Sequence, residues 1–373
     1  MKGERARELL LNILSDTGIT LNGSNPWDIK VTDDRFYQRV LRHGSLGLGE
    51  SYMDGWWECD RLDEFFSRLI PARPEERLGK DLRRLFSLIK SAGKDPGRIA
   101  RAFQIGERHY DIGNDLYRAM LDRRMVYSCG YWNHADDLNA AQEAKLDLIC
   151  RKLRIVPRQW VLDIGCGWGG FARYAAERYQ ARVTGITVSR EQAKLAAEIC
   201  GGLPIDILLQ DYRELSGKFD HIVSVGMFEH VTRKHHRSFM KIAYRCLADS
   251  GLFLLHTIGS NLTKTANDPW IEKYIFPNSI IPSTRQICAA LDGLFIVEDW
   301  QNIGADYDRT LMSWHGNFEC NWPSLKDRYG ERFRRMWRYY LLSSAAAFRT
   351  RYMQVWQIVL SKNGVPGGYQ SVR

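Results

Sequence analysis

The sequence predicts an α/β protein in which a small, mostly helical N-terminal domain precedes a doubly wound parallel sheet. The first observation is an alternation of apolar runs with segments of helical spacing from residue 160 onward. The expected strands cover residues 160–163, 182–187, 205–209, 219–225 and 251–257, and the expected helices cover 170–179, 190–200 and 235–247. Such alternation is typical of parallel sheets, because each crossover between parallel strands needs a helix. The second observation is a Gly-rich turn, VLDIGCGWGGF at 161–171, which joins the first of these strands to the first helix.

The length of 373 residues suits two domains, because single hydrophobic cores stop growing near about 250–300 residues. We place an N-terminal domain at 1–92 and a second domain at 98–373, with the boundary in the Pro- and Gly-containing stretch 91–97. In the first domain we expect helices at 4–14, 62–70 and 80–91, a short amphipathic piece at 36–41 and a Gly-rich aromatic stretch at 44–58. Trp56 and Trp57 in that stretch suit either the core of the small domain or contact with lipid.

Three further segments complete the second domain. We expect a helix at 138–153 that leads to the Gly-rich strand, a basic aromatic helix at 333–350 and a last strand at 353–361. Ligands of doubly wound sheets bind at the carboxyl ends of the strands. We therefore look for functional residues at those strand ends.

Composition narrows the class of protein. The net charge of +9 favours an anionic partner, either nucleic acid or an anionic membrane surface, although a merely solvated basic surface would have the same charge. No run of 18 uncharged apolar residues exists, so we expect no membrane span. The N-terminus contains acids and no signal-like apolar core, and the eight cysteines form no C-x-x-C pair. These features predict a cytoplasmic protein without a zinc ribbon or a disulfide framework.

The Gly-rich turn taken alone is ambiguous. Gly165, Gly167 and Gly170 match G-x-G-x-x-G, but a dinucleotide site also needs an acid at the end of the next strand, where 187–189 has none. Acids stand instead before the glycines, at Asp163, and after the third strand, at Asp211. This arrangement resembles the nucleoside pocket of S-adenosylmethionine methyltransferases. A dinucleotide site and a turn without any ligand are the alternatives.

Several motifs together identify a family resemblance. Besides the Gly-rich turn, they are HYDIGNDLY at 109–117, YSC at 127–129, GITVSREQ at 185–192, QDYR at 210–213, MFEHV at 227–231, LHTIG at 255–259 and YDRTL at 307–311. The chain resembles the cyclopropane-fatty-acyl-phospholipid synthase family over nearly its whole length, including the N-terminal domain that the shorter mycolic acid cyclopropane synthases lack. The resemblance implies a Rossmann-like class I methyltransferase sheet.

The resemblance also implies a reaction. Family members transfer a methyl group from S-adenosylmethionine to the cis double bond of a phospholipid acyl chain and then close a cyclopropane ring. Attack by the alkene leaves a carbocation, so a base must remove a proton from the new methyl group. The cation also needs a pocket that excludes water, because water would convert it to an alcohol.

A bound bicarbonate ion serves as that base in the family. The matching positions here are Cys129, Glu229, His256 and Tyr307, with the backbone amide of Ile258 as a further donor. Imidazole, phenol, thiol and amide groups can donate to an oxyanion, and a carboxylate can accept from its protonated oxygen. The alternatives for Cys129 are a covalent nucleophile and a metal site shared with His256. No ligand spacing supports the metal site, so we expect no metal.

The cofactor residues follow from the same resemblance. Near the methionine moiety we expect Tyr127 and Ser128, and near the methionine and the ribose the turn residues Asp163, Gly165, Cys166, Gly167, Gly169 and Gly170. We expect Thr187, Ser189 and Gln192 on the ribose side, and Asp211 with Tyr212 at the adenine. The resemblance has one departure: family members often carry a cysteine where this chain has Ser344. We interpret that position as structural, because the carbocation route needs no enzyme nucleophile.

The expected partners are unsaturated acyl chains and the inner face of the membrane, to which the protein would bind peripherally. Basic docking residues would be Arg83 and Arg84 or the cluster 332–338. We expect a homodimer whose N-terminal domain binds lipid or mediates dimerisation. No nucleic acid is expected, because no RNP or KH pattern is present. The other functions to weigh are a lipid methyltransferase that yields methyl-branched or hydroxylated chains, a small-molecule methyltransferase, and a binding protein with a vestigial cofactor pocket.

Overall fold

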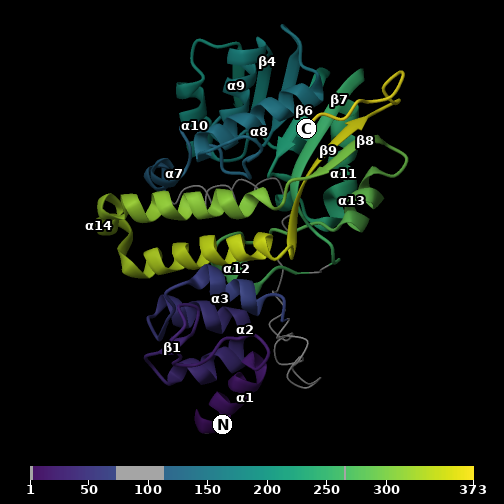
Figure 1. Ribbon diagram of the computed structural model, residues 1–373. Coiled ribbons are helices and arrows are strands. Elements are labelled where there is room, and N and C mark those ends of the chain that lie inside the picture. Colours follow the sequence, from purple (N-terminus) through teal and green to yellow (C-terminus); the bar gives the residue numbers. More distant parts are fainter. Residues whose placement is uncertain (1–2, 73–112, 264–265) are drawn as a thin grey trace. The chain divides into compact units, whose positions relative to one another are not determined.

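The computed structural model describes residues 3–72, 113–263 and 266–373 (Figure 1). The chain divides into two compact units. Within the described residues, the first unit contains 3–72, 267–277 and 311–352, and the second contains 113–263, 266, 278–310 and 353–373. The first unit therefore includes two segments that the sequence assigns to the second domain. The expected helix at 80–91, the linker 91–97 and the start of the 109–117 motif lie outside the described residues.

The second unit is built around a seven-stranded sheet with the order β5-β4-β3-β6-β7-β9-β8. Its strands are β3 (Trp160–Ile164), β4 (Arg182–Thr187), β5 (Ile205–Leu209), β6 (Phe219–Val225), β7 (Leu247–Ser260), β8 (Ile296–Asn302) and β9 (Met353–Ser361). The pairs from β5 to β7 are parallel, and β9 pairs antiparallel with both β7 and β8. The doubly wound α/β fold predicted from the alternation is confirmed.

Helices cover both faces of this sheet (Figure 1). They are α7 (Asn114–Met120), α8 (Leu138–Leu153), α9 (Gly170–Tyr179), α10 (Arg190–Ile199), α11 (His236–Cys246) and α13 (Thr284–Leu291), with short 3₁₀ turns η1 (Tyr212–Glu214), η2 (Phe228–His230) and η3 (Arg233–His235). Successive residues of β3 point to opposite faces. Val161 accordingly packs in a core with residues of α8 and α9, and Leu162 packs in a second core with residues of α11 and α13.

The first unit is mostly helical, as the sequence predicts. It contains α1 (Gly3–Leu14), β1 (Lys30–Val31), α2 (Arg35–Met53), β2 (Trp57–Glu58), α3 (Leu62–Leu69), α12 (Pro269–Tyr274) and most of α14 (Asp306–Arg349). Trp57 is fully buried, with its ring centroid 5.1 Å from that of Tyr52 and 5.4 Å from that of Phe65. Trp57 is therefore a core residue of this unit. Among the described residues, no helix combines the length and the apolar character needed to cross a bilayer.

The structure differs from the sequence prediction in several elements, and helices α12 and α13 are among those that were not predicted. Helix α2 continues to Met53 through a kink at Gly44 (φ 55°, ψ −130°), where the sequence predicts a Gly-rich aromatic stretch. Helix α14 begins at Asp306 rather than near residue 333, and Figure 1 shows it as two arms, with non-helical backbone at Gly330 (φ 73°). Strand β8, at one edge of the sheet, is absent from the prediction.

Candidate active site

The turn between β3 and α9 has a backbone conformation that glycine adopts most readily. Gly165, Gly167 and Gly169 have φ angles of +87°, +56° and +81°. A Cβ atom on Gly165 would lie 2.7 Å from the Cβ of Met227, so this glycine permits the segment after β6 to approach. A Cβ atom on Gly167 would meet no atom of the described residues within 4 Å. The turn therefore borders open space.

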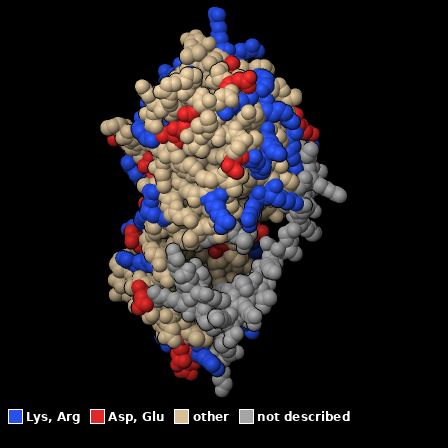
Figure 2. All heavy atoms as spheres, turned by 90° about the vertical axis from the view of Figure 1, so that its right-hand side faces the viewer, with Lys and Arg blue, Asp and Glu red and all other residues tan. Residues whose placement is uncertain are grey.

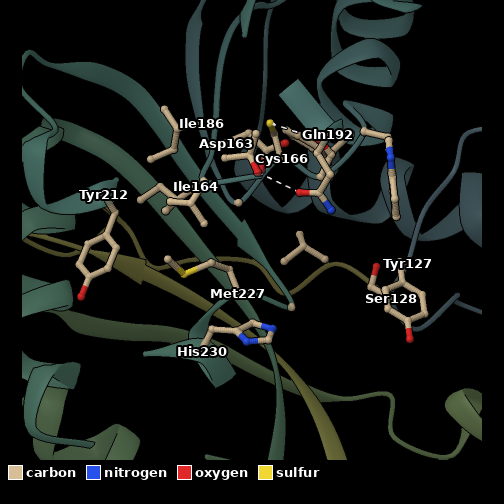
Figure 3. A pocket seen from close by; sticks show the side chains of 18 of the residues that line it. Tyr127, Ser128, Asp163, Ile164, Cys166, Ile186, Gln192, Tyr212, Met227 and His230 are labelled. Carbon is tan, nitrogen blue, oxygen red and sulfur yellow. Dashed lines mark hydrogen bonds between the residues drawn. The ribbon is translucent and has the colours of Figure 1, made fainter. Parts of the chain in front are cut away.

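That space is a cavity at the carboxyl ends of the parallel strands, where ligands of such sheets bind. Figure 3 shows Tyr127 and Ser128 at one end of the cavity and Tyr212 at the other, with Asp163 and Gln192 on a wall between them. The lining includes the following predicted cofactor residues: Tyr127, Ser128, Asp163, Gly165, Cys166, Gly167, Gly170, Thr187, Gln192, Asp211 and Tyr212. Other lining residues, among them Trp168, Met227 and His230, were not predicted.

Two predicted cofactor residues, Gly169 and Ser189, do not line the cavity. Gly169 is the N-cap of α9, and a Cβ atom on it would lie 2.8 Å from Cys200 Sγ. Ser189 is the N-cap of α10, and its Oγ accepts a hydrogen bond from the backbone N–H of Gln192 at 3.2 Å. Both residues therefore support the neighbours that do line the cavity.

Hydrogen bonds fix the polar residues of the cavity wall. Thr187 Oγ1 donates to Gln192 Oε1 at 2.9 Å, which orients the Gln192 amide. The carboxylate of Asp211 accepts two hydrogen bonds from the Arg213 guanidinium, at 2.7 and 2.8 Å, and one from the Arg213 backbone N–H at 2.9 Å. The acid expected at the adenine is therefore held by an arginine that lines the same cavity.

Asp163 is a buried acid of this cavity whose pKa is strongly raised. Its side chain is buried, and Oδ2 has no hydrogen-bond partner among the described residues. Burial raises the pKa of Asp163 to about 7, although the positive charge of Lys145 partly opposes that rise. A buried carboxylate oxygen that lacks a protein partner fits a ligand that donates hydrogen bonds.

Lys145 is the main functional candidate that the sequence prediction missed. It lies on α8, lines the cavity, is fully buried and donates from Nζ to Ser128 Oγ at 2.9 Å. One signal was available in the sequence. Lys145 shares a helical face with Gln142, Leu146 and Ile149, all of which are buried, and a lysine on such a face calls for an explanation.

The five predicted catalytic residues, Cys129, Glu229, His256, Ile258 and Tyr307, do not line this cavity. Two of them are brought near each other by hydrogen bonds of their neighbours. Gly130 N–H donates to Thr310 Oγ1 at 3.1 Å, and Trp132 N–H donates to Asp306 Oδ2 at 3.1 Å. These bonds tie the loop that carries Cys129 to the first turn of α14, which carries Tyr307.

Glu229 and Ile258 are in direct contact. The backbone N–H of Ile258, on β7, donates to Glu229 Oε1, on η2, at 2.6 Å. Glu229 Oε2 has no hydrogen-bond partner among the described residues. Burial raises the pKa of Glu229 to about 7, and the Ile258 amide partly opposes that rise. The amide predicted to donate to a bound anion thus holds the carboxylate instead.

His256 lies next to a residue that lines the cavity. The Gly226 N–H, from a residue that lines the cavity, donates to the His256 carbonyl at 2.9 Å. The Nδ1 atom of His256 lies 3.3 Å from Gln357 Nε2, so Nδ1 accepts when that amide donates and the proton is then on Nε2. Burial lowers the pKa of His256 well below its usual range, which keeps the imidazole neutral.

Cys129 has the environment of an inert thiol. It is fully buried, and its Sγ lies 3.8 Å from the carbonyl oxygen of Ile303. Burial raises the pKa of this thiol well above its usual range, so the thiolate that a nucleophile requires is disfavoured. The environment therefore suits a hydrogen-bonding group better than a covalent one.

Comparisons with known proteins show which family and which proteins the chain resembles. The sequence pattern of the mycolic acid cyclopropane synthetase family matches residues 98–358. The cyclopropane-fatty-acyl-phospholipid synthase of Escherichia coli is 52% identical over 361 residues, which cover 97% of this chain and 94% of the relative. A probable fatty acid methyltransferase of Pseudomonas putida is 37% identical over 349 residues, which cover 86% of this chain and 84% of the relative. The solved structure of the mycolic acid cyclopropane synthase CmaA1 complexed with SAH and CTAB matches with a TM-score of 0.64 and 30% identity, covering 70% of this chain and 98% of that one.

Proposed function

The chain belongs to the mycolic acid cyclopropane synthetase family, and from that premise we propose that it is a cyclopropane-fatty-acyl-phospholipid synthase. The proposed reaction converts the cis double bond of an unsaturated phospholipid acyl chain into a cyclopropane. The observation that carries the proposal is the buried carboxylate of Glu229, whose Oε2 atom lacks a partner among the described residues. The cyclopropane-fatty-acyl-phospholipid synthase of Escherichia coli supports phospholipid as the substrate, because it is similar to this chain over nearly the full length of both.

The residues of the cavity fit S-adenosylmethionine. The glycine turn leaves open space at Gly167, and the unpartnered oxygen of Asp163 can accept from a ligand donor. The Gln192 amide and the Asp211–Arg213 pair supply polar groups for the ribose and the adenine. When bound, S-adenosylmethionine supplies a methyl group on a sulfonium, which is electrophilic enough for attack by an alkene.

The predicted catalytic residues fit a bicarbonate ion, which would supply the base that accepts the ring-closing proton. The neutral imidazole of His256 and the un-ionised thiol of Cys129 can donate hydrogen bonds to an oxyanion. The ionised form of Glu229 can accept from a protonated oxygen through Oε2, while Ile258 fixes Oε1. Tyr307 would offer a further hydroxyl group from the first turn of α14, which is hydrogen-bonded to the loop of Cys129.

Burial of these groups protects the reaction from water. Cys129, Glu229, His256 and Tyr307 each have at most 7% of their surface exposed. A carbocation formed beside them would meet few water molecules, so proton loss and ring closure would prevail over formation of an alcohol. This burial favours the synthase over a methyltransferase that yields hydroxylated chains.

We propose that the protein binds the membrane peripherally through η3 and α11. Residues 231–248 contain no acid, and their lysine and arginine residues are Arg233, Lys234, Arg237, Lys241 and Arg245. Helix α11 lies at the right of Figure 1, and Figure 2, which views that side, shows a concentration of basic side chains. Anionic lipid attracts such a segment by about 1 kcal/mol per basic residue near the surface.

The structure does not favour either of the two docking positions predicted from the sequence. Arg83 and Arg84 lie outside the described residues. The arginines of 332–338 are paired with acids: Arg332 with Asp54, Arg334 and Arg338 with Glu319, and Arg335 with Glu58. These pairs offset the charge that lipid would attract. We keep the cytoplasmic location and the homodimer as parts of the proposal, and sedimentation velocity tests the dimer.

Mass spectrometry of acyl chains tests the proposed substrate. The protein is incubated with S-adenosylmethionine and either vesicles of monounsaturated phospholipid or the matching free fatty acid. We expect a gain of one CH₂ in the phospholipid chains and none in the free acid. Equal reaction with the free acid would contradict the phospholipid assignment, and reaction with neither would direct the search to small-molecule acceptors.

Vesicle binding tests the docking segment. We expect anionic vesicles to bind the protein less as salt rises, and the double variant Arg233→Gln/Lys241→Gln to bind them more weakly than wild type. Arg332→Gln/Arg334→Gln is the matched control, because it also removes two charges and these are paired with Asp54 and Glu319. Binding that is insensitive to salt, or a control that loses as much as the double variant, would contradict this docking surface.

A further inference from the structure

Helix α8 carries two fully buried lysines with different surroundings. Lys152 Nζ lies 3.6 Å from Asp299 Oδ2 and donates to Gln301 Oε1 at 2.6 Å. Lys145 Nζ donates to the neutral hydroxyl of Ser128, and no carboxylate of the described residues lies within 4.0 Å of it. An ammonium has three donors, and the described residues accept one of those of Lys145. Lys145 is thus a buried cation without a protein ion pair in the described chain.

None of the described charged groups that act on Lys145 forms an ion pair in contact with it. Lys145 interacts electrostatically with four titratable groups, namely Asp122, Cys129, Asp163 and His256. Asp122 uses its two carboxylate oxygens to accept from the backbone N–H groups of Arg124 and Val126. Burial raises the pKa of the Cys129 thiol and lowers that of the His256 imidazole, so both of these side chains are uncharged.

Asp163 is the remaining acid in that set. It lines the same cavity as Lys145, but the two groups lie too far apart for an ion pair within 4.0 Å. Tyr127, Ser128, Lys145 and Asp163 all line the cavity, so a ligand group bound there can lie near Lys145. A buried cation is costly unless an anion approaches it, and Lys145 faces a cavity in which one can bind.

We propose that Lys145, together with the Ser128 hydroxyl that it holds, recognises the carboxylate of the methionine moiety of S-adenosylmethionine. The inference rests on the proposed function, because it assumes that this cofactor fills the cavity. It adds a charged recognition group to the polar residues expected at that end of the cavity. Lys145 would position the cofactor by its carboxylate while the adenosine part binds independently at the other end, near Asp211 and Tyr212.

The geometry has a consequence for proton binding. Burial lowers the pKa of Lys145 to about 8, so a fraction of the free protein carries a neutral amine at pH 8.5. A carboxylate beside Nζ favours the ammonium and raises that pKa. Binding of a nucleoside that has the amino-acid moiety should therefore take up more protons at pH 8.5 than protonation of the ligand's own α-amino group accounts for. A nucleoside without that moiety should not.

Isothermal titration calorimetry with S-adenosylhomocysteine and 5′-methylthioadenosine tests the proposal. The second compound has the same adenosine part but lacks the amino-acid moiety. We expect Lys145→Met to bind S-adenosylhomocysteine about 10- to 100-fold more weakly, in line with the loss of a charged hydrogen bond, and to bind 5′-methylthioadenosine as wild type does. Lys152→Met, which removes the other buried lysine of α8, should retain both affinities.

Several outcomes would overturn the proposal. It fails if Lys145→Met binds both nucleosides with wild-type affinity, or if it loses the same factor for both. If Lys145→Met does not fold, the wild-type protein decides the question, because titrations in buffers of different ionisation enthalpy at pH 8.5 measure proton uptake directly. Uptake with S-adenosylhomocysteine that is no larger than its own α-amino group accounts for would contradict the assignment of Lys145. Failure of wild type to bind either nucleoside would instead contradict the cofactor itself and hence the proposed function.

Discussion

Replacing Glu229 by glutamine separates the chemical function of this carboxylate from its effect on stability. Glutamine has nearly the same shape and retains an oxygen that can accept from the Ile258 N–H. It cannot ionise, so it can neither carry the negative charge nor orient a protonated oxyanion in the same way. We expect turnover to fall by about 10²- to 10³-fold, the cost typical of removing one preorganised electrostatic group. Affinity for S-adenosylhomocysteine should stay unchanged, because Glu229 does not line the cofactor cavity.

The same change should stabilise the protein at alkaline pH. Burial raises the pKa of Glu229 from 4.5 to about 7, so the folded chain binds this proton more tightly than the unfolded chain. Its contribution to stability is therefore greatest below pH 4.5 and declines as pH rises to 7. With about 1.4 kcal/mol per pKa unit, ionisation of Glu229 lowers the free energy of unfolding by about 3 kcal/mol at pH 8. Glu229→Gln removes that pH-dependent loss.

Urea unfolding of both proteins between pH 4.5 and 8, without added bicarbonate, measures this difference. We expect the stability of Glu229→Gln relative to wild type to rise by about 3 kcal/mol across that range. We also expect wild-type turnover to rise with pH up to about 7, because the ionised carboxylate is the active form. A stability difference that does not vary with pH, or a variant that retains turnover within about threefold of wild type, would refute the reasoning.

Three other substitutions test separate parts of the site. Gly167→Val should abolish S-adenosylhomocysteine binding in a calorimetric titration, because a β-branched side chain at φ +56° would be strained and would enter the cavity; retained binding would contradict the assignment of the turn. Cys129→Ser should keep turnover within about tenfold of wild type, because a hydroxyl can still donate a hydrogen bond; complete loss in a folded variant would indicate a nucleophile. Ser344→Cys should leave the turnover rate within about twofold of wild type, whereas a large gain would show that the family's cysteine has a catalytic function.

The sheet and its helices could be predicted because their signals are local. Apolar β-branched runs such as 182–187 and 219–225 alternate with helical segments, and the resulting β4 and β6 lie where the pattern places them. The carboxyl ends of those strands then fix the position of the cavity. Most of the predicted cofactor residues line it for that reason.

Strand β8 could not be predicted because distant residues satisfy its polar side chains. Glu298 Oε1 accepts from Ser361 Oγ, and the carboxylate of Asp299 accepts from Arg373 and Ser371 near the end of the chain. Two adjacent acids are unusual in a buried-sheet pattern. Only the folded chain supplies the partners that make them compatible with an edge strand.

The second half of helix α2 was missed because glycines lower helix propensity. The close approach that they permit is a tertiary feature: a Cβ atom on Gly49 would lie 2.3 Å from the indole of Trp270, which belongs to α12. Glycine there is needed for packing between segments more than 200 residues apart in the sequence. A local pattern contains no information on that contact.

The site was predicted in part. The residue types at Cys129, Glu229, His256 and Tyr307 come from four separate segments, so only a family resemblance could group them. The pairing of the Ile258 N–H with Glu229 depends on the relative position of η2 and β7, which the sequence does not specify. Lys145 was missed because lysines on helices are usually solvated, and its burial depends on the loop that carries Ser128.

The product formed by wild-type protein with and without bicarbonate tests the central claim most directly. Monounsaturated phospholipid vesicles and S-adenosylmethionine are incubated in carbonate-free buffer and in the same buffer with bicarbonate restored, and the acyl chains are analysed by mass spectrometry. The account predicts that bicarbonate restores chains that have gained one CH₂ and lost their double bond. Chains that gain CH₂ but keep a double bond or acquire a hydroxyl group, or a cyclopropane yield that ignores bicarbonate, would contradict it.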